Sequence, residues 1–255
     1  IGAEAARTFA RFGATVVLVG RTQKKLEAVY DAIEAAGGPQ PMIFVMDFAK
    51  AQGDDYQNLH DGLQQEFGRL DGLLHNASIL GARSPIEHHD VKTWLETIHI
   101  NLNAPFILTQ ALLPLLRKSP DPSIVFTSSG VGRKGRAFWG AYGVSKFGTE
   151  GLMQTLADEA TDMRVNCINP GATRTAMRKA AYPGEDHAIG SQVQVMGRVS
   201  GAKTKFRWRG GDRLHDHLRI QPHHQAVLVD AGAGPGEDRP GIVVEHPHAH
   251  LCQQA

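Results

Sequence analysis

The stretch GAYGVSKFG at residues 140–148 contains a tyrosine and a lysine that are four residues apart. Four residues is about one turn of an α-helix, so Tyr142 and Lys146 are expected to share one helix face. The pKa of a free tyrosine is about 10. A neighbouring ammonium stabilises the phenolate, so the pair predicts a tyrosine whose pKa is shifted toward neutrality and that exchanges protons with a carbonyl or an alcohol. The spacing also fits two partly exposed helix residues without a catalytic role.

Three segments upstream of this helix place further polar groups beside predicted strands. Ser129 lies in IVFTSSG (124–130), whose β-branched run predicts a buried strand with the serine at its carboxyl end, where ligands bind in open α/β sheets. Asn101 lies in a helical stretch, HINLNAP (99–105), and DGLLHNAS (71–78) predicts an apolar strand that ends at His75. Together these segments indicate one α/β site rather than an isolated helical pair.

With NPGATRT at residues 169–175, these motifs follow the order and separations of a known family. The NAG-like turn at Asn76, then Asn101, Ser129, YGVSK and NPGATRT resemble the shorter, single-domain short-chain dehydrogenases/reductases. The resemblance implies a catalytic group in which Tyr142 gives a proton to a carbonyl oxygen or takes one from an alcohol, while Ser129 hydrogen-bonds that oxygen. It also implies that Lys146 lowers the tyrosine pKa and holds the nicotinamide ribose, and that Asn101 anchors a water that links Lys146 to solvent. The alternative is a capping serine, a core-edge tyrosine and a solvated lysine.

Arg21 indicates which dinucleotide this site prefers. It follows a strand that ends at Val19 and Gly20, a position where an acidic residue would hydrogen-bond the ribose of NAD. A neutral residue followed by arginine leaves room and charge for a 2′-phosphate, so the sequence predicts NADP(H) in preference to NAD(H). The other interpretation is a solvated arginine at a strand end.

The resemblance implies further cofactor contacts, each of which can also be an ordinary turn residue. Asp47 would bind the adenine amino group, Asn76 and Ala77 would let the backbone approach the cofactor, and Gly2 would pack against the pyrophosphate at a helix N-terminus. The nicotinamide side would be bound by the turn after the last predicted strand. The implied cofactor residues are Gly2, Arg21, Asp47, Asn76, Ala77, Tyr142, Lys146, Pro170, Gly171 and Thr175.

The apolar periodicity predicts an alternation of helices and strands from Ala3 to Ile168. Helices are expected around 3–11, 22–33, 56–67, 91–98, 104–118 and 142–160, and strands around 15–19, 42–46, 70–74, 123–127 and 165–168. Repeated β-α-β units with short connections predict a doubly wound, Rossmann-type parallel sheet covered by helices on both faces.

Both ends of the chain depart from that pattern. The chain begins at Ile1 and Gly2, which look like the last two residues of the family's TGxxxGxG turn, so we expect a sheet without its first strand, as in a truncated record or fragment. An exposed backbone edge would then invite aggregation. We therefore assign 1–186 to an NAD(P)-binding domain that is incomplete at its N-terminus, and 187–255 to a divergent tail.

The tail, residues 187–255, has two interpretations. A shifted reading frame is preferred to a natural but poorly ordered segment, because histidines accumulate there among arginines, glycines and prolines. Within it, AVLVDAGAGPG (226–236) looks like a strand that runs into a glycine-rich phosphate loop. It is interpreted instead as a flexible loop, because charged residues and Pro240 follow where an apolar helix should start. His246, His248 and His250 alternate as metal ligands on a strand would, but without a scaffold or an acidic or cysteine partner we expect no metal.

Composition narrows the class of partner. The 255 residues carry a formal net charge of +1 with interspersed charges, which argues against nucleic acid or an anionic membrane. The most apolar stretch, around 104–116, is too short to span a bilayer, and Cys167 and Cys252 give no disulfide framework, so we expect a cytoplasmic protein. From the resemblance alone, a homodimer or homotetramer would assemble through the helices at 104–118 and 142–160.

The predicted function is an NADP(H)-dependent oxidoreductase that interconverts a small-molecule carbonyl and alcohol. One alternative is a catalytically inactive fragment that binds cofactor weakly or not at all. Another keeps the fold and changes the reaction to enoyl reduction or epimerisation. The substrate pocket is expected between residues 131–139 and 172–186.

Overall fold

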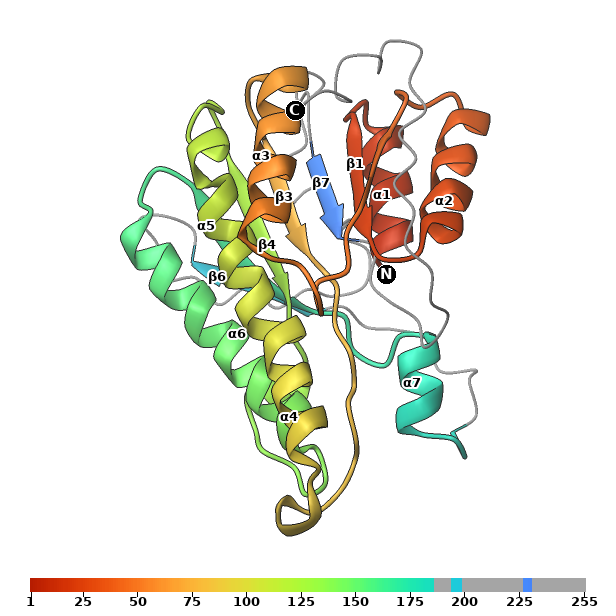
Figure 1. The fold of residues 1–255 in the computed structure, drawn as a ribbon, viewed down its shortest axis with the longest axis vertical. Helices are drawn as coiled ribbons and strands as arrows, with labels where there is room; N and C mark the ends of the chain where they lie inside the picture. The colour runs from red at the N-terminus through yellow and green to blue at the C-terminus, as the bar shows by residue number, and fades with distance from the viewer. Residues whose placement is uncertain (186–193, 199–226, 231–255) are drawn as a thin grey trace.

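The computed structural model describes residues 1–185, 194–198 and 227–230, and their strands form one seven-stranded sheet in the order β2-β1-β7-β3-β4-β5-β6 (Figure 1). β5 and β6 pair antiparallel, and every other neighbouring pair is parallel. The strands are β1 (Val16–Gly20), β2 (Met42–Val45), β3 (Gly72–His75), β4 (Ser123–Thr127), β5 (Arg164–Asn169), β6 (Gln194–Arg198) and β7 (Val227–Asp230).

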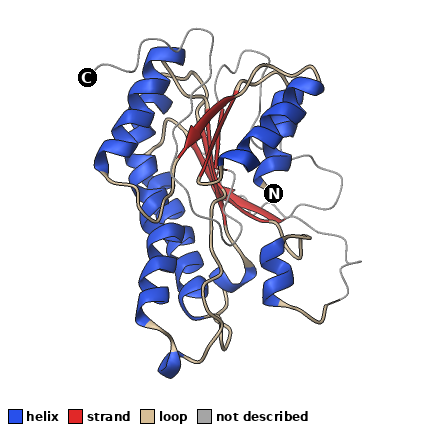
Figure 2. Cartoon of the chain, turned by 45° about the vertical axis from the view of Figure 1, so that its right-hand side comes forward, coloured by secondary structure: helices blue, strands red, loops and turns tan. Residues whose placement is uncertain are grey.

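Helices cover both faces of this sheet (Figure 2), which confirms the predicted doubly wound architecture. The bounds of α1 to α6 lie within a few residues of those expected from the periodicity, whereas the short α7 was not predicted. A π-helical turn at His99–Asn103 joins α4 to α5. The helices are α1 (Gly2–Arg11), α2 (Gln23–Ala35), α3 (Gly53–Phe67), α4 (Val91–Ile98), α5 (Ala104–Leu116), α6 (Gly140–Glu159) and α7 (Ala176–Ala181).

Side-chain alternation along the strands divides the core into two layers. Successive strand residues point to opposite faces, so Val17 and Phe126 pack with α3, α5 and α6, whereas their neighbours Val16 and Val125 pack with α1 and α2. Both faces are buried, which is why these strands are nearly continuous apolar runs in the sequence.

The central position of the sheet, expected to be empty, is filled by β7. This strand pairs in parallel with β1 on one side and β3 on the other, and Leu228 is fully buried between them. The prediction of a flexible loop at 226–236 was therefore wrong for Val227–Asp230. The physical reason is that a short apolar run can satisfy its backbone by pairing with both neighbouring strands, whatever residues follow it. The inner edges of β1 and β3 are consequently not exposed in this structure.

Two short parts of the predicted tail thus belong to the sheet, because β6 and β7 both follow residue 186. The division of the chain at residue 187 stays a prediction. His246, His248 and His250 lie outside the described residues, as does Cys252. In the part that is described, no cluster of histidine, cysteine or acidic side chains is suited to a metal ion. None of the described helices has the length and hydropathy of a bilayer-spanning segment.

Candidate active site

Parallel strands bring the predicted site residues to one edge of the sheet. β1, β3, β4 and β5 all end at this edge, and the residues that follow them include Arg21, Asn76, Ser129 and Pro170. Asp47 lies two residues beyond the end of β2 at the same edge. Ligands bind at the carboxyl ends of the strands in doubly wound sheets, so this edge is the candidate active site.

Tyr142, Lys146 and Ser129 meet there. Tyr142 and Lys146 lie one turn apart on α6 and are both buried, with exposed fractions of 8% and 3%. The side chain of Ser129 hydrogen-bonds that of Tyr142. The Nζ atom of Lys146 lies 5.5 Å from the centre of the Tyr142 ring and donates a hydrogen bond to the carbonyl oxygen of Thr127 at 2.9 Å. The structure therefore brings together the three groups that the sequence predicted to act together.

The direction of the Tyr142 pKa shift differs from the prediction. Burial raises the pKa of Tyr142, and the hydrogen bond from Ser129 offsets that rise only in part. The prediction of a lowered pKa was wrong for this structure, because removal of the phenolate from water outweighs its stabilisation by neighbours. The phenol therefore stays protonated at neutral pH, which is the form that donates a proton.

Asn101 connects the loop after β3 to α6. Its side-chain oxygen accepts from the backbone N–H of Ile79 at 2.8 Å, and its nitrogen donates to the carbonyl oxygen of Ile79 at 2.9 Å and to Ser145 Oγ at 3.1 Å. Ser145 in turn donates to the backbone oxygen of Tyr142 at 2.8 Å. These contacts give Asn101 a positioning effect on Tyr142, and the predicted water-anchoring role stays a prediction.

The implied cofactor residues lie at the start of α1 and just after β1, β2 and β3, at the same edge of the sheet. Gly2 is the buried first residue of α1, and Arg21 lies half-buried directly after β1. The carboxylate of Asp47 accepts from the backbone N–H of Ala49 at 3.1 Å. Asn76 and Ala77 follow β3 directly. The placement agrees with the binding of a dinucleotide at the ends of β1, β2 and β3.

The turn after β5 is shaped by its glycine. Gly171 has a φ of +66°, a conformation that side chains disfavour, and its N–H bonds the side-chain oxygen of Asn169 at 3.1 Å. Thr175, expected beside the nicotinamide, uses its hydroxyl to accept from Arg178 N at 3.1 Å and so caps α7. Pro170 precedes the turn, and its carbonyl oxygen accepts from Thr173 Oγ1 at 2.8 Å. The predicted contacts of Pro170, Gly171 and Thr175 with the nicotinamide stay predictions.

Two buried hydroxyls support the fit of a polar ligand to this edge. The side-chain oxygens of Ser78 and Thr127 have no hydrogen-bond partner within the described part of the chain. Both residues lie just after, or at the end of, strands that finish at the candidate active site. A polar group that entered this edge would remove the cost of leaving such groups unpaired.

Tyr142 and Trp139 belong to one small hydrophobic cluster, against which Tyr182 also packs. Trp139 lies 5.7 Å from Tyr142, and Tyr182 lies 5.9 Å from Trp139, between ring centres. The guanidinium of Arg83 lies 4.8 Å from the centre of the Trp139 ring and 5.3 Å from that of Tyr182. Trp139 and Tyr182 come from the two segments that were expected to shape the substrate pocket, and together they form an aromatic wall beside Tyr142. Asp186, the last residue of the second segment, lies outside the described residues.

His75, the last residue of β3, is buried beside this site and was singled out in the sequence only as a strand end. Its ring stacks on Phe126 with centres 4.6 Å apart, and Nε2 lies 2.8 Å from Thr109 Oγ1. Thr109 donates its own proton to the carbonyl oxygen of Pro105 at 2.7 Å, so Nε2 must donate to Thr109. Burial lowers the pKa of His75 to about 3, and the side chain is neutral at physiological pH.

We expect His75 to make folding stability depend on pH. The unfolded chain has a histidine pKa of about 6.5, so between that pH and about 3 the unfolded state binds one more proton than the folded state. The free energy of unfolding should therefore decrease by up to about 1.4 kcal/mol for each unit by which the pH is lowered through this window. Urea unfolding of wild type and His75→Gln at about pH 7 and about pH 5 measures this contribution. The difference in stability between the two proteins should shrink at the lower pH; parallel pH dependences would contradict the prediction.

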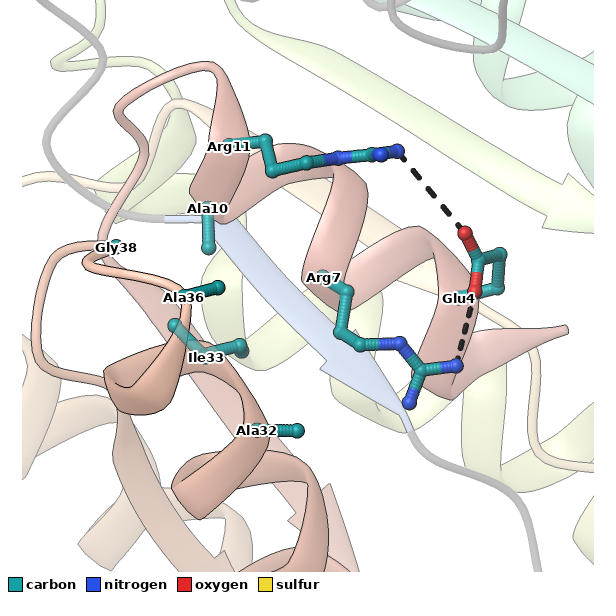
Figure 3. A pocket seen from close by; sticks show the side chains of 8 residues that line it. All are labelled: Glu4, Arg7, Ala10, Arg11, Ala32, Ile33, Ala36 and Gly38. Atoms are coloured by element: carbon teal, nitrogen blue, oxygen red, sulfur yellow. Dashed lines mark hydrogen bonds and ion pairs between the residues drawn. The ribbon is translucent and has the colours of Figure 1, made fainter.

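A separate hollow of ≈ 120 Å³ lies between α1 and α2 (Figure 3). Its lining includes Ile33 and the charged residues Glu4, Arg7 and Arg11. Arg7 pairs with Glu4 at 2.9 Å. None of the predicted catalytic or cofactor residues lines this hollow, so it is not part of the candidate active site.

Comparisons with known proteins agree with this arrangement. A family model described as short chain dehydrogenase matches residues 1–186. The uncharacterized oxidoreductase YciK of Escherichia coli K12 is 53% identical over 187 residues, which are 73% of this chain and 74% of YciK.

Two solved relatives contain a bound dinucleotide. A short chain dehydrogenase from Shigella flexneri 2a strain 301, complexed with NADP, has a TM-score of 0.71 and 53% identity, covering 72% of this chain and 77% of its own. A second short chain dehydrogenase, from Escherichia coli CFT073 and complexed with NADPH, has a TM-score of 0.71 and 54% identity. The match covers 72% of this chain and 78% of that one. On the matched family model and these identities, this chain belongs to the short chain dehydrogenase family.

Proposed function

We propose that the protein is an NADP(H)-dependent oxidoreductase that interconverts a carbonyl and an alcohol, with Tyr142 as the acid and base. The observation that carries the proposal is the meeting of Tyr142, Ser129 and Lys146 at the carboxyl edge of the sheet. A carbonyl oxygen that accepts from both hydroxyls would be polarised and oriented for addition at its carbon. The cofactor, when bound, supplies the hydride.

The residues divide the work between proton transfer and positioning. Tyr142 gives its proton to the carbonyl oxygen during reduction and takes one from the alcohol during oxidation. Ser129 donates to the same oxygen and stabilises the charge that develops there. The ammonium of Lys146, close to the ring, favours the phenolate that remains after transfer. The Ser129 and Tyr142 pair favours this reaction over enoyl reduction or epimerisation.

Titration with NADPH distinguishes this proposal from the alternative of an inactive fragment. Saturable quenching of the tryptophan fluorescence, together with consumption of NADPH in the presence of a panel of carbonyl compounds, is the expected result. The aromatic wall of Trp139 and Tyr182 favours substrates with an apolar group next to the carbonyl. Absence of both binding and turnover in folded protein would support the inactive alternative.

Arg21 is proposed to select NADP(H) over NAD(H). Its place after β1, and the neutral Gly20 before it, support contact with the 2′-phosphate. Since a hydrogen bond to a charged group contributes about 1.5–3 kcal/mol, Arg21→Ala should raise the KM for NADPH at least about tenfold and leave that for NADH nearly unchanged. Lys24→Ala, which removes an exposed cation on α2, is the matched control. Equal effects on both cofactors would contradict the assignment.

We also propose that the protein forms a homodimer or homotetramer through α5 and α6. Phe106 on α5 and Val144 and Phe147 on α6 are large apolar side chains that are 44–49% exposed in the single chain. Burial of such side chains between copies would be favourable, and a sedimentation coefficient of a monomer would contradict the proposal. A cytoplasmic location stays a prediction.

A further inference from the structure

Glu150 extends the column of functional side chains on α6 by one more turn. Tyr142, Lys146 and Glu150 follow one another at intervals of four residues, so they share one face of the helix. Each contacts the segment 127–133, the loop that carries Ser129. Tyr142 bonds Ser129, Lys146 bonds the carbonyl oxygen of Thr127, and Glu150 bonds residues on either side of Ser129.

The carboxylate of Glu150 holds that loop at two points. Ser128 Oγ donates to its Oε1 at 2.6 Å, and Arg133 Nε lies 2.9 Å from each of its two oxygens. The side chains of Glu150 and Arg133 are only 12% and 26% exposed. A carboxylate that is this well buried needs its partners, and loss of its charge would leave the guanidinium poorly compensated.

Close packing makes the loop sensitive to these bonds. The backbone N–H of Ser128 donates to Ile168 O at 2.7 Å, and that of Gly132 donates to Ser129 O at 2.9 Å. Gly132 packs so tightly on α6 that an added Cβ would lie 2.8 Å from the backbone oxygen of Lys146. The close contact at Gly132 restricts the position of the loop on α6, and Glu150 provides the ionic contacts that hold the loop in that position.

We propose that Glu150, with Arg133 as its partner, is a positioning residue that sets the Ser129 hydroxyl against Tyr142. It touches neither substrate nor cofactor and acts through the loop. The inference rests on the proposed function, in which the two hydroxyls act on one oxygen. A displacement of about 1 Å in a catalytic group can lower the rate by about 100-fold, so the loss of these contacts should be visible in kcat.

Asp71 provides a matched control at the opposite end of the sheet. Like Glu150, it is a buried carboxylate that accepts from a serine and an arginine: Ser119 Oγ at 2.5 Å and Arg69 Nε at 3.2 Å. It precedes β3, whereas the candidate active site lies where that strand ends. Asp71→Asn therefore removes a comparable charge without touching the Ser129 loop.

The experiment compares Glu150→Gln, Asp71→Asn and Tyr142→Phe in the full chain. Both carboxylate variants should lower the melting temperature, but only Glu150→Gln should lower kcat, by about 10- to 100-fold, with the KM for NADPH changed less than about threefold. Arg133→Gln should lower kcat similarly, and the double variant should be no worse than Glu150→Gln, because both changes break one contact. If Glu150→Gln fails to fold, Ser128→Ala removes one of the same bonds at lower cost.

Amide hydrogen exchange gives a readout that needs no turnover. Residues 128–133 should exchange faster in Glu150→Gln than in wild type, and at the wild-type rate in Asp71→Asn. Unchanged exchange, or a kcat within about twofold of wild type while Tyr142→Phe is inactive, overturns the inference. A fully active Tyr142→Phe instead overturns the proposed function, while the exchange result still decides whether Glu150 holds the loop.

Discussion

Replacement of Tyr142 by phenylalanine is expected to lower kcat by about 10²- to 10⁴-fold, the usual contribution of a general acid or base. The change removes one oxygen atom and keeps the ring, so the packing against Trp139 is retained. Because the phenol is buried, water cannot easily replace it as the proton donor. Steady-state turnover of NADPH with an accepted carbonyl substrate is the measurement.

Tyr30→Phe is the matched control for this result. Tyr30 lies on α2, and its hydroxyl accepts from Gln40 at 2.7 Å, so the variant also loses one tyrosine hydrogen bond. It should retain wild-type kcat. Tyr142→Phe with turnover close to that of Tyr30→Phe, in protein of normal circular dichroism and cofactor affinity, would rule out Tyr142 as the proton donor.

Leu228→Asp is expected to reduce the free energy of unfolding by about 3–5 kcal/mol, the range for a buried charge without a partner. Leu228 is fully buried in β7 and packs in the core layer formed with α3, α5 and α6. The free energy of unfolding of a domain is typically about 5–15 kcal/mol, so this single change should remove a large fraction of the stability. Urea unfolding followed by circular dichroism measures the difference.

The control for Leu228→Asp places the same aspartate on the surface. Ile86 is 69% exposed, and Ile86→Asp should change stability by less than about 0.5 kcal/mol. A chain that ends at residue 226 lacks β7 and should be destabilised at least as much as Leu228→Asp, because β1 and β3 then lose a partner strand. Wild-type stability in both altered chains would show that β7 is not an integral strand.

Much of the fold was accessible from local pattern. Apolar runs bounded by glycines and helical stripes predicted the order of elements up to Ile168, because the periods of helix and strand are read directly from residue spacing. The run Val227–Asp230 looks like a strand from its apolar residues, but its surroundings in the sequence gave no reason to place it in the sheet. Its four residues carry no helix-strand alternation around them, and only the gap between β1 and β3 gives them a place.

Some residues of the candidate site were also predictable from local sequence patterns, and others were not. The spacing of Tyr142 and Lys146 was sufficient to place both on one helix face, and the order of motifs was sufficient to bring Ser129 to them. Glu150 continues the four-residue spacing, which was a signal that the sequence analysis did not use. Its two partners, Ser128 and Arg133, are 22 and 17 residues away in the chain, so their contacts depend on how the loop lies on α6.

By itself, then, the sequence determined the alternation of elements and the placement of Tyr142 and Lys146 on one helix face, because these follow from the spacing of residues within one element. The class of site was indicated by the resemblance that the order of the motifs carries. The tertiary structure alone decided three things: which strand fills the centre of the sheet, that burial raises the pKa of Tyr142, and which carboxylate holds the Ser129 loop. The pKa of Tyr142 depends on exclusion of water, and the other two depend on contacts between segments that are distant in the sequence. Both the burial and the contacts exist only once the chain has folded.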